Sequence, residues 1–248
     1  PYTGVNTLYL WAVADARGFT SPYWMTARQA AELGAEVREG ERYAISVYYA
    51  TAKKAAARAQ TAEQGDRVFR FNADQIEGLP AHYHPEPADC LKDPVEQRAG
   101  IEDFFNAIPV PVRHGGERAY YSPASDHIQL PRARHFQSLD HYWSTRGHEC
   151  VHATGAAHRL KRQFGKRFGD KAYAFEELVA CLGQSFISAE LGLPASLHDS
   201  HASYIASWIE VLERDKTAII HAAAKAEQAV AWLRACTAND AAIAQIAA

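Results

Sequence analysis

The sequence has 248 residues, of which 48% are hydrophobic, and a formal net charge of −3 at pH 7. This length accommodates one large domain or two smaller ones with buried cores, whereas no apolar run approaches the roughly 20 residues that span a bilayer, and the first residues show no export signal. The four cysteines are widely spaced and form no CxxC pair, which argues against a disulfide framework and is typical of a reducing cytoplasm. We therefore expect a cytoplasmic protein without a membrane partner, and the charge alone makes no case for nucleic-acid binding.

The first part of the chain is predicted to be a small α+β domain over residues 1–93. Apolar residues at helical spacing predict a helix over Val5–Ala16 that ends at Gly18. The stretch "TARQAAELG" predicts a short helix with Thr26 as its N-cap and Gly34 as its C-cap. The segments "REGERYAISVYYA" and "RVFRFNADQIEGLP" predict a strand, then a returning strand with a short helix, on either side of a polar, alanine-rich stretch.

The second part is predicted to be a mostly helical domain with a short antiparallel sheet over residues 94–248. A proline-rich segment from Pro80 to Pro94 predicts the linker before it. A helix is expected near Val95–Ala107, and "ERAYYSPASDHIQLP" predicts a hairpin with a Ser-Pro turn. From Ser138 onward the pattern is helical in at least four segments, so the predicted fold class is α+β.

The stretch "RGHECVHATG" contains two histidines four residues apart. Ser138 as N-cap and Gly155 as a stop predict that it lies on one helix. Residues four apart on a helix differ by about 40° in direction, so His148 and His152 project from one face and can both reach a zinc ion. Glu149 follows the first histidine, where it can act as a general base on water without binding metal. The pattern thus predicts two metal ligands and one catalytic base.

A catalytic zinc site needs a third protein ligand, and the sequence offers three candidates. The stretch "YAFEELVACLG" supplies Glu176 and Glu177 on another amphipathic helix. We favour Glu177, because the residue four positions later, Cys181, falls where such sites usually support a ligand, although a carboxylate is more usual there. His158 stands six residues after the second histidine, as in three-histidine proteases, but no methionine turn follows it. Zinc is expected, or another divalent metal such as Mn or Co.

Each of these residues also has a plain structural interpretation. In a chain with twelve histidines, the two helical histidines can be partly buried residues bonded to carbonyls. Tyr120, Tyr121 and His127 on the predicted hairpin can form a substrate-side edge, but sheet packing is the simpler expectation for each. Cys150 is expected to be a small core residue that points away from the histidine face.

Motifs along nearly the whole chain, in order, resemble those of one protein family. They are "YTGVNTLYLW", "GFTSPYWMTARQAAELGAEVREGER", "FNADQIEGLP", "RAYYSPASDHIQLP", "HECVHATGAAHRLKR", "FGDKAYAFEELVACLG" and "YIASWIEVLERDKTAIIHAAAKAEQA". With these motifs the chain resembles the ArdC-type antirestriction proteins of conjugative plasmids, which share modules with TraC-type primases. The resemblance implies a single-stranded-DNA-binding domain over residues 1–93 and a zincin-like metallopeptidase domain over residues 94–248, with DNA and a protein or peptide substrate as partners. It also implies a family segment before Pro1.

The resemblance carries over the roles of the site residues. It implies His148, His152 and Glu177 as metal ligands and Glu149 as the base. One departure is Cys181, which stands where the family pattern "EELVAELG" has an acidic residue. The alternatives to an antirestriction peptidase are a non-catalytic protein that coats or shields DNA and whose metal is structural, and a module of a larger conjugation effector.

The residues themselves support DNA binding only weakly. Residues 1–93 hold 10 Lys and Arg against 12 Asp and Glu, so binding to single strands would depend on aromatic stacking. The aromatic candidates, which also suit a domain core, are Tyr2, Tyr9, Trp11, Phe19, Tyr23 and Trp24. A basic cluster on the connection between the two metal helices can be a phosphate-contacting rim or a solvated loop. Its members are Arg159, Lys161, Arg162, Lys166, Arg167 and Lys171.

Overall fold

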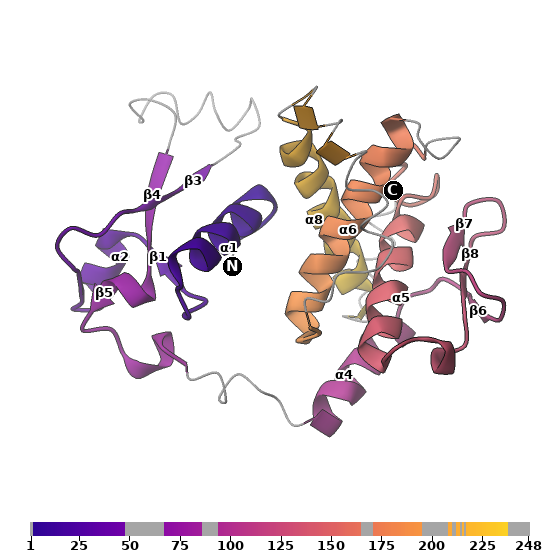
Figure 1. Ribbon diagram of the computed structural model, residues 1–248, viewed down its shortest axis with the longest axis horizontal. Coiled ribbons are helices and arrows are strands. Elements are labelled where there is room, and N and C mark those ends of the chain that lie inside the picture. Colours follow the sequence, from indigo (N-terminus) through magenta and orange to yellow (C-terminus); the bar gives the residue numbers. More distant parts are fainter. Residues whose placement is uncertain are drawn as a thin grey trace. The chain divides into compact units, whose positions relative to one another are not determined.

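The chain divides into two compact units (Figure 1). One comprises residues 1–2 and 6–92, and the other comprises residues 3–5 and 93–248. The computed structural model describes residues 2–47, 67–85, 94–164, 171–194, 208–209, 212–213, 215 and 217–237. The alanine-rich stretch after the first predicted strand and most of the proline-rich linker lie outside the described residues.

The helices of the first unit form where capping and apolar spacing predict them. Helix α1 spans Val5–Arg17, and Gly18 follows in the left-handed conformation. Helix α2 spans Ala27–Glu32, and the side chain of Thr26 caps it in a reciprocal capping box with Gln29. The two predicted helices are therefore confirmed, with α1 one residue longer than expected.

The strands of the first unit form two small antiparallel sheets. The larger sheet has the order β1-β4-β3, and its strands span Trp24–Met25, Arg67–Asn72 and Ala44–Val47. The smaller sheet pairs β2 (Glu36–Val37) with β5 (Ile76–Glu77). Two 3-10 helices, η1 (Ala73–Gln75) and η2 (Ala81–Tyr83), complete the described part of the unit. A small apolar core between α2 and the strands holds them together, and it consists of Met25, Ala30, Ala35 and Ile76.

The second unit is built around three long helices that pack side by side (Figure 1). They are α5 (Leu139–Thr154), α6 (Lys171–Leu191) and α8 (Ala218–Thr237), and α4 (Pro94–Asn106) packs against α6 and α8. Gly183 lets α6 approach α5 closely, because a Cβ atom there would lie 2.8 Å from Cγ2 of Val151. This close packing brings the side chains of α5 and α6 together in the buried interior.

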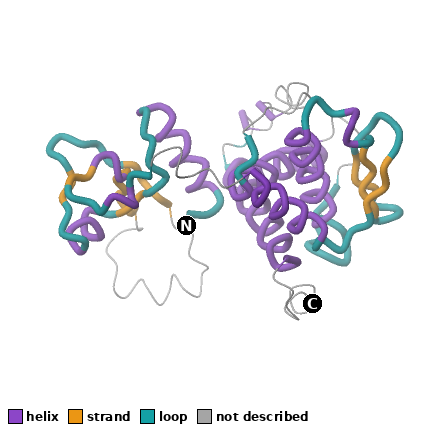
Figure 2. Tube along the Cα trace, turned by 90° about the horizontal axis from the view of Figure 1, so that it is seen from below, coloured by secondary structure: helices purple, strands orange, loops and turns teal. Residues whose placement is uncertain are grey.

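A three-stranded sheet packs against α5 (Figure 1), and Figure 2 shows its strands in orange beside the helices of this unit. The predicted hairpin is confirmed as β7 (Tyr120–Ser122) and β8 (His127–Leu130), which pair antiparallel. A further strand that the sequence did not predict, β6 (Val112–His114), pairs parallel to β8, and η3 (Ala133–His135) follows the sheet. The chain is α+β, as predicted. Among the described residues, none of the helices combines the length and apolarity that crossing a membrane requires.

Candidate metal centre

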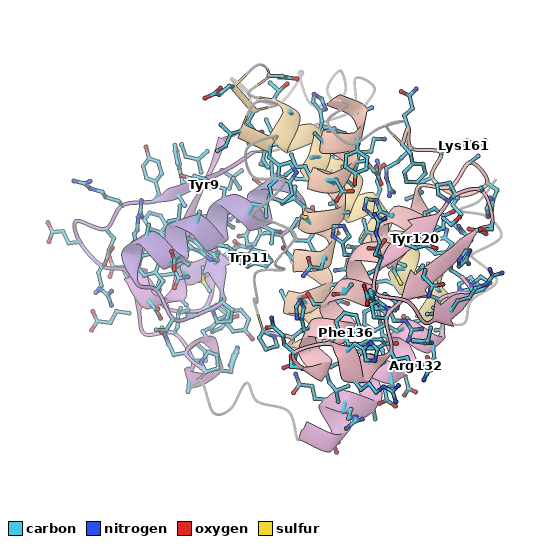
Figure 3. The ribbon with its side chains drawn as sticks, turned by 45° about the vertical axis from the view of Figure 1, so that its right-hand side comes forward. Tyr9, Trp11, Tyr120, Arg132, Phe136 and Lys161 are labelled. Carbon is cyan, nitrogen blue, oxygen red and sulfur yellow. The ribbon has the colours of Figure 1, made fainter. Side chains whose placement is uncertain are left out.

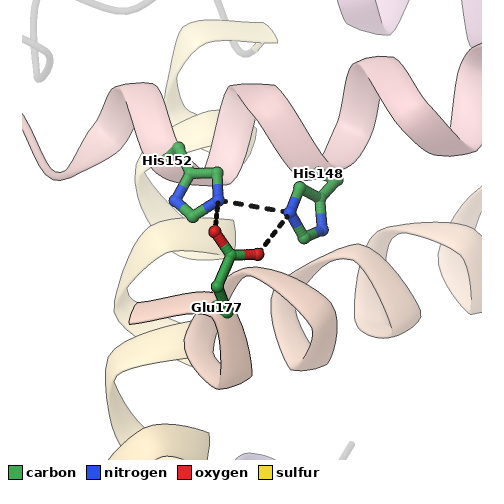
Figure 4. A group of neighbouring side chains, drawn as sticks. All are labelled: His148, His152 and Glu177. Atoms are coloured by element: carbon green, nitrogen blue, oxygen red, sulfur yellow. Dashed lines mark hydrogen bonds and ion pairs between the residues drawn. The ribbon is translucent and has the colours of Figure 1, made fainter. Parts of the chain in front are cut away.

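Helix α5 holds the two histidines of the motif in a fixed relation. The Ser138 side chain accepts a hydrogen bond from the backbone N–H of His141 and so caps the helix. Most of the helix is buried, including His148, whereas His152 is half-buried. His148 and His152 lie one turn apart, and their Nε2 atoms are 3.2 Å from each other (Figure 4). The two imidazoles therefore present their Nε2 atoms to one point.

Helix α6 supplies a carboxylate at the same point. The Oε2 atom of Glu177 lies 3.4 Å from Nε2 of His148, and its Oε1 atom lies 3.4 Å from Nε2 of His152 (Figure 4). Ligands bound tetrahedrally to one ion at 2.0–2.1 Å are separated from each other by about 3.4 Å. The donor set and its spacing therefore fit a divalent ion, and these three residues form a metal-binding group.

The charges around this group are strongly coupled. Burial alone would lower the pKa of His152, but hydrogen bonds to Glu176 and Glu177 outweigh it and raise the pKa to about 10. Burial would raise the pKa of Glu177, but hydrogen bonds from His148 and His152 hold it well below its usual range. Without metal, protonated His152 thus stabilises the fold below its ordinary pKa of 6.5, and this contribution fades as the pH rises toward 10. A metal ion must displace that proton, so metal binding strengthens as the pH rises.

Glu149 and Glu176 lie next to the group but outside it. Glu149 is buried on α5, and its charge contributes to the raised pKa of His152, which places it within electrostatic reach of that ligand. Glu176 is also buried, with its Oε1 atom 3.2 Å from Nδ1 of His152, on the side of the ring away from Nε2. It also forms an ion pair with Arg162. Glu176 therefore contacts a metal ligand without joining the three-residue group.

His158, the alternative third ligand, lies outside the metal-binding group. Helix α5 ends at Thr154, and the chain turns immediately afterwards. The side chain of His158 is 63% exposed, and its Nε2 atom lies 3.3 Å from Oδ2 of Asp126. The structure therefore assembles the arrangement with a glutamate and not the one with three histidines.

The cysteines near the site are buried thiols. The Sγ atom of Cys181 lies 3.8 Å from Nδ1 of His148, so a thiol occupies the supporting position where an acidic residue was the usual expectation. Burial raises the pKa of Cys181. Burial also raises the pKa of Cys150, to about 12, and this residue is fully enclosed by the core, as predicted. Both thiols are thus protonated at neutral pH.

The basic cluster after α5 differs from a phosphate-contacting rim at two positions. Arg159 is buried and binds both carboxylate oxygens of Asp126 at 2.8 Å, and the side chain of Arg162, only 4% exposed, is paired with Glu176. These internal ion pairs correct the expectation that the two arginines face DNA. Lys161 is exposed (Figure 3). Outside the described residues lie Lys166, Arg167 and the side chain of Lys171.

The aromatic candidates of the first unit divide into exposed and half-buried residues. Trp11 on α1 (Figure 3) and Tyr23 are exposed. The hydroxyl of Tyr2 donates a hydrogen bond to the carbonyl of Trp24, and the Trp24 ring packs edge-on against Phe19. Trp11 and Tyr23 therefore expose part of their ring surface, although the Tyr23 ring also packs edge-on against Tyr83, whereas Tyr2 and Trp24 serve the packing of the unit.

The sequence did not single out two exposed aromatic residues that the structure brings together. Tyr43, directly before β3, and Phe69, on β4, are each 47% exposed, and their ring centroids lie 4.2 Å apart. Strand alternation predicts the face of β4 on which residue 69 lies. Residue 43 precedes β3, so alternation within the strands does not predict that the two rings meet. On the hairpin, Tyr121 and His127 are buried packing residues, whereas Tyr120 is exposed (Figure 3).

Comparisons with known proteins agree with this architecture. Residues 99–225 match the family described as zincin-like metallopeptidase, and residues 1–75 match the N-terminal domain of anti-restriction factor ArdC. The Mn(II)-bound crystal structure of the antirestriction ArdC protein from plasmid R388 is 38% identical, with a TM-score of 0.79 over 96% of this chain and 86% of that one. Its metal-free structure is 36% identical, with a TM-score of 0.74 over the same shares.

Two curated relatives extend the comparison. An uncharacterised protein, y4eC, of Sinorhizobium fredii is 40% identical over 94% of this chain and 78% of its own length. The DNA primase TraC of Escherichia coli is 36% identical over 92% of this chain, which corresponds to only 22% of the primase. The fold and the metal-binding group define a zincin-like metallopeptidase domain that follows an ArdC-type N-terminal domain in the sequence. The chain belongs to the ArdC family of antirestriction proteins.

Proposed function

We propose that the chain is an antirestriction protein that binds single-stranded DNA through its N-terminal unit and hydrolyses peptide bonds at its metal centre. The observation that carries the peptidase part is the convergence of His148, His152 and Glu177 beside the carboxylate of Glu149. The DNA part is supported by the similarity to a primase and by exposed aromatic side chains in the first unit.

Each residue of the centre has a distinct task in this proposal. A divalent ion supplies a Lewis acid that polarises a peptide carbonyl and lowers the pKa of water to about 7. His148, His152 and Glu177 hold the ion in place, and Glu149 is left free of that task. Its carboxylate takes the proton from the attacking water and delivers it to the leaving amine. The loss of this proton transfer is therefore the cleanest test of catalysis.

Glu149→Gln is expected to lower peptide cleavage at least about 100-fold, because glutamine cannot accept the proton. The measurement is mass spectrometry of a mixed peptide library incubated with Mn(II)- or Zn(II)-loaded protein. Wild type should produce new termini that are absent with the variant, while both proteins carry equal metal. No new termini from either metal-loaded protein would show that the metal braces the fold and does not serve catalysis, whereas equal cleavage by both would show that Glu149 is not the base.

Stacking is the interaction that the first unit offers to single strands. Residues 1–93, with 10 basic and 12 acidic residues, provide few phosphate contacts. Exposed aromatic rings at Trp11, Tyr23, Tyr43 and Phe69 can stack on bases regardless of sequence. The proposal therefore implies a preference for single strands over duplex, with little sequence preference and a weak dependence on salt.

The double variant Tyr43→Ala/Phe69→Ala is expected to weaken single-strand binding roughly tenfold or more, since a stacked base contributes about 1–3 kcal/mol. Fluorescence anisotropy of the full chain with a labelled oligothymidine, at low and moderate salt, measures the effect. Leu33→Ala removes a similarly exposed apolar side chain that cannot stack, and it should bind as wild type does. Equal losses in both variants, or a steep loss of wild-type affinity with salt, would contradict stacking.

A further inference from the structure

The segment that follows α5, residues 155–164, folds back onto the helix it leaves. Backbone N–H groups of Leu160 and Arg162 donate hydrogen bonds to the carbonyls of Thr154 and Gly155, at 2.9 and 3.0 Å. This return brings the side chain of Arg162 into the interior between α5 and α6. The segment thus contributes a buried cation beside the metal-binding group.

All three nitrogen atoms of the Arg162 guanidinium donate hydrogen bonds there. Its Nη2 and Nε atoms donate to the two carboxylate oxygens of Glu176 at 2.9 and 3.0 Å. Nη1 donates to the Thr154 hydroxyl at 2.7 Å, and Nη2 also donates to the Val151 carbonyl at 2.6 Å. A forked contact of this kind fixes the plane of a carboxylate, which a single-point contact from a lysine cannot do. Arg162 therefore determines how Glu176 is oriented.

Glu176 passes this orientation to a metal ligand. Its Oε1 atom lies 3.2 Å from Nδ1 of His152, while Nε2 of the same ring faces Glu177 and His148. A carboxylate that accepts the Nδ1 proton leaves the Nε2 lone pair free for metal, and it also fixes the angle of the ring. The Arg162–Glu176–His152 contacts thus form one continuous chain that ends at the metal-binding group.

Gly155 and Phe164 show that the segment is fitted closely around this chain. Gly155 has an ordinary helical φ of −77°, so backbone conformation does not require a glycine there. A Cβ atom at that position would lie 2.7 Å from Cζ of Phe164 and 3.0 Å from Nη2 of Arg162. The Phe164 ring in turn lies 6.4 Å from the ring of His152. The glycine therefore provides the space in which Arg162 and Phe164 pack.

We propose that Arg162 is a positioning residue of the metal centre, which acts through Glu176 to fix the tautomer and orientation of His152 and so strengthens divalent-metal binding. This inference rests on the proposed metal centre but not on peptide hydrolysis. In this proposal Arg162, a buried member of the basic cluster, supports metal binding and does not contact DNA. Support of this kind changes metal affinity by about 10- to 100-fold in characterised sites.

Metal competition against a chelator, in the full chain, tests this proposal. Arg162→Gln is expected to lower Zn(II) affinity about 10- to 100-fold and to shift the visible absorption bands of the Co(II)-loaded protein, because the ligand geometry changes. Arg159→Gln is the matched control, since it removes an arginine side chain of the same segment that is similarly buried and is paired with a carboxylate away from the metal-binding group, that of Asp126, which is 35% exposed. This control should keep the wild-type affinity and spectrum.

Two further variants cover the case in which Arg162→Gln does not fold. Arg162→Lys keeps the charge but cannot make the forked contact. Its metal affinity should therefore lie below that of wild type, and its Co(II) spectrum should remain shifted from that of wild type. Glu176→Leu removes the link to His152 and should lower the affinity at least as much. Unchanged Co(II) spectra and affinities in Arg162→Lys and Glu176→Leu, or equal losses in Arg159→Gln, would overturn the proposal. Wild type that binds Co(II) but cleaves no peptide would contradict only the peptidase function.

Discussion

Replacing His152 by alanine is expected to abolish stoichiometric divalent metal in the purified protein. The remaining pair, His148 and Glu177, supplies two ligands, and a zinc site needs at least three protein ligands for tight binding. The loss also removes the ring that both Glu176 and Glu177 contact. Inductively coupled plasma mass spectrometry of the wild-type and variant proteins, after identical metal loading and desalting, measures the effect.

Glu149→Gln is the matched control for this experiment. The side chain is buried on the same helix, but it lies outside the three-residue group, so the variant should keep a full equivalent of metal. Circular dichroism of both variants shows whether the fold is retained. If Glu149→Gln loses as much metal as His152→Ala, the assignment of ligand and base is wrong.

Replacing Glu177 by alanine is expected to lower metal affinity by more than about 1000-fold, well beyond the 10- to 100-fold of a supporting residue. The carboxylate lies 3.4 Å from the Nε2 atoms of both His148 and His152, at the spacing of ligands that share one ion. Removing it also leaves the Nε2 atoms of the two imidazoles facing each other without the carboxylate that contacts both. Competition between the protein and a fluorescent zinc chelator measures the affinity.

His158→Ala separates the two kinds of site. His158 is exposed and paired with Asp126, so its removal should leave metal affinity within about twofold of wild type, as expected of a surface position. The metal affinity of Glu176→Gln should lie between the affinities of His158→Ala and Glu177→Ala, because an amide oxygen still accepts the proton of His152. If His158→Ala proves to be the damaging change, the centre uses three histidines and must rearrange from the geometry seen here.

The local elements of the fold follow from the sequence because their signals are local. Thr26 with Gln29 and Ser138 are capping side chains, and both helices begin where they predict. The spacing of His148 and His152 likewise fixes their common face as soon as a helix forms. The choice of Glu177 over Glu176 rests instead on the position of Cys181 four residues later, because both glutamates are buried on α6.

The contacts that depend on chain reversal did not follow from the sequence. Arg162 lies in a run of basic residues and reads as part of a solvated or DNA-facing loop, but the turn after α5 buries it against Glu176. Gly155 reads as a helix stop, yet its main effect is to leave room for two side chains that come from further along the chain. Strand β6 is too short to carry a periodic signal, and its parallel partner is distant in the sequence.

Diffraction from crystals grown with Mn(II), recorded above the manganese absorption edge, tests the metal centre most directly. We predict one strong anomalous peak bounded by Nε2 of His148, Nε2 of His152 and the carboxylate of Glu177, at roughly 2.0–2.3 Å from each ligand atom. The Nδ1 atom of His152 should remain hydrogen-bonded to the carboxylate of Glu176, with no anomalous peak beside it. A peak ligated by His158, or no peak between the three residues in metal-loaded crystals, would contradict this centre.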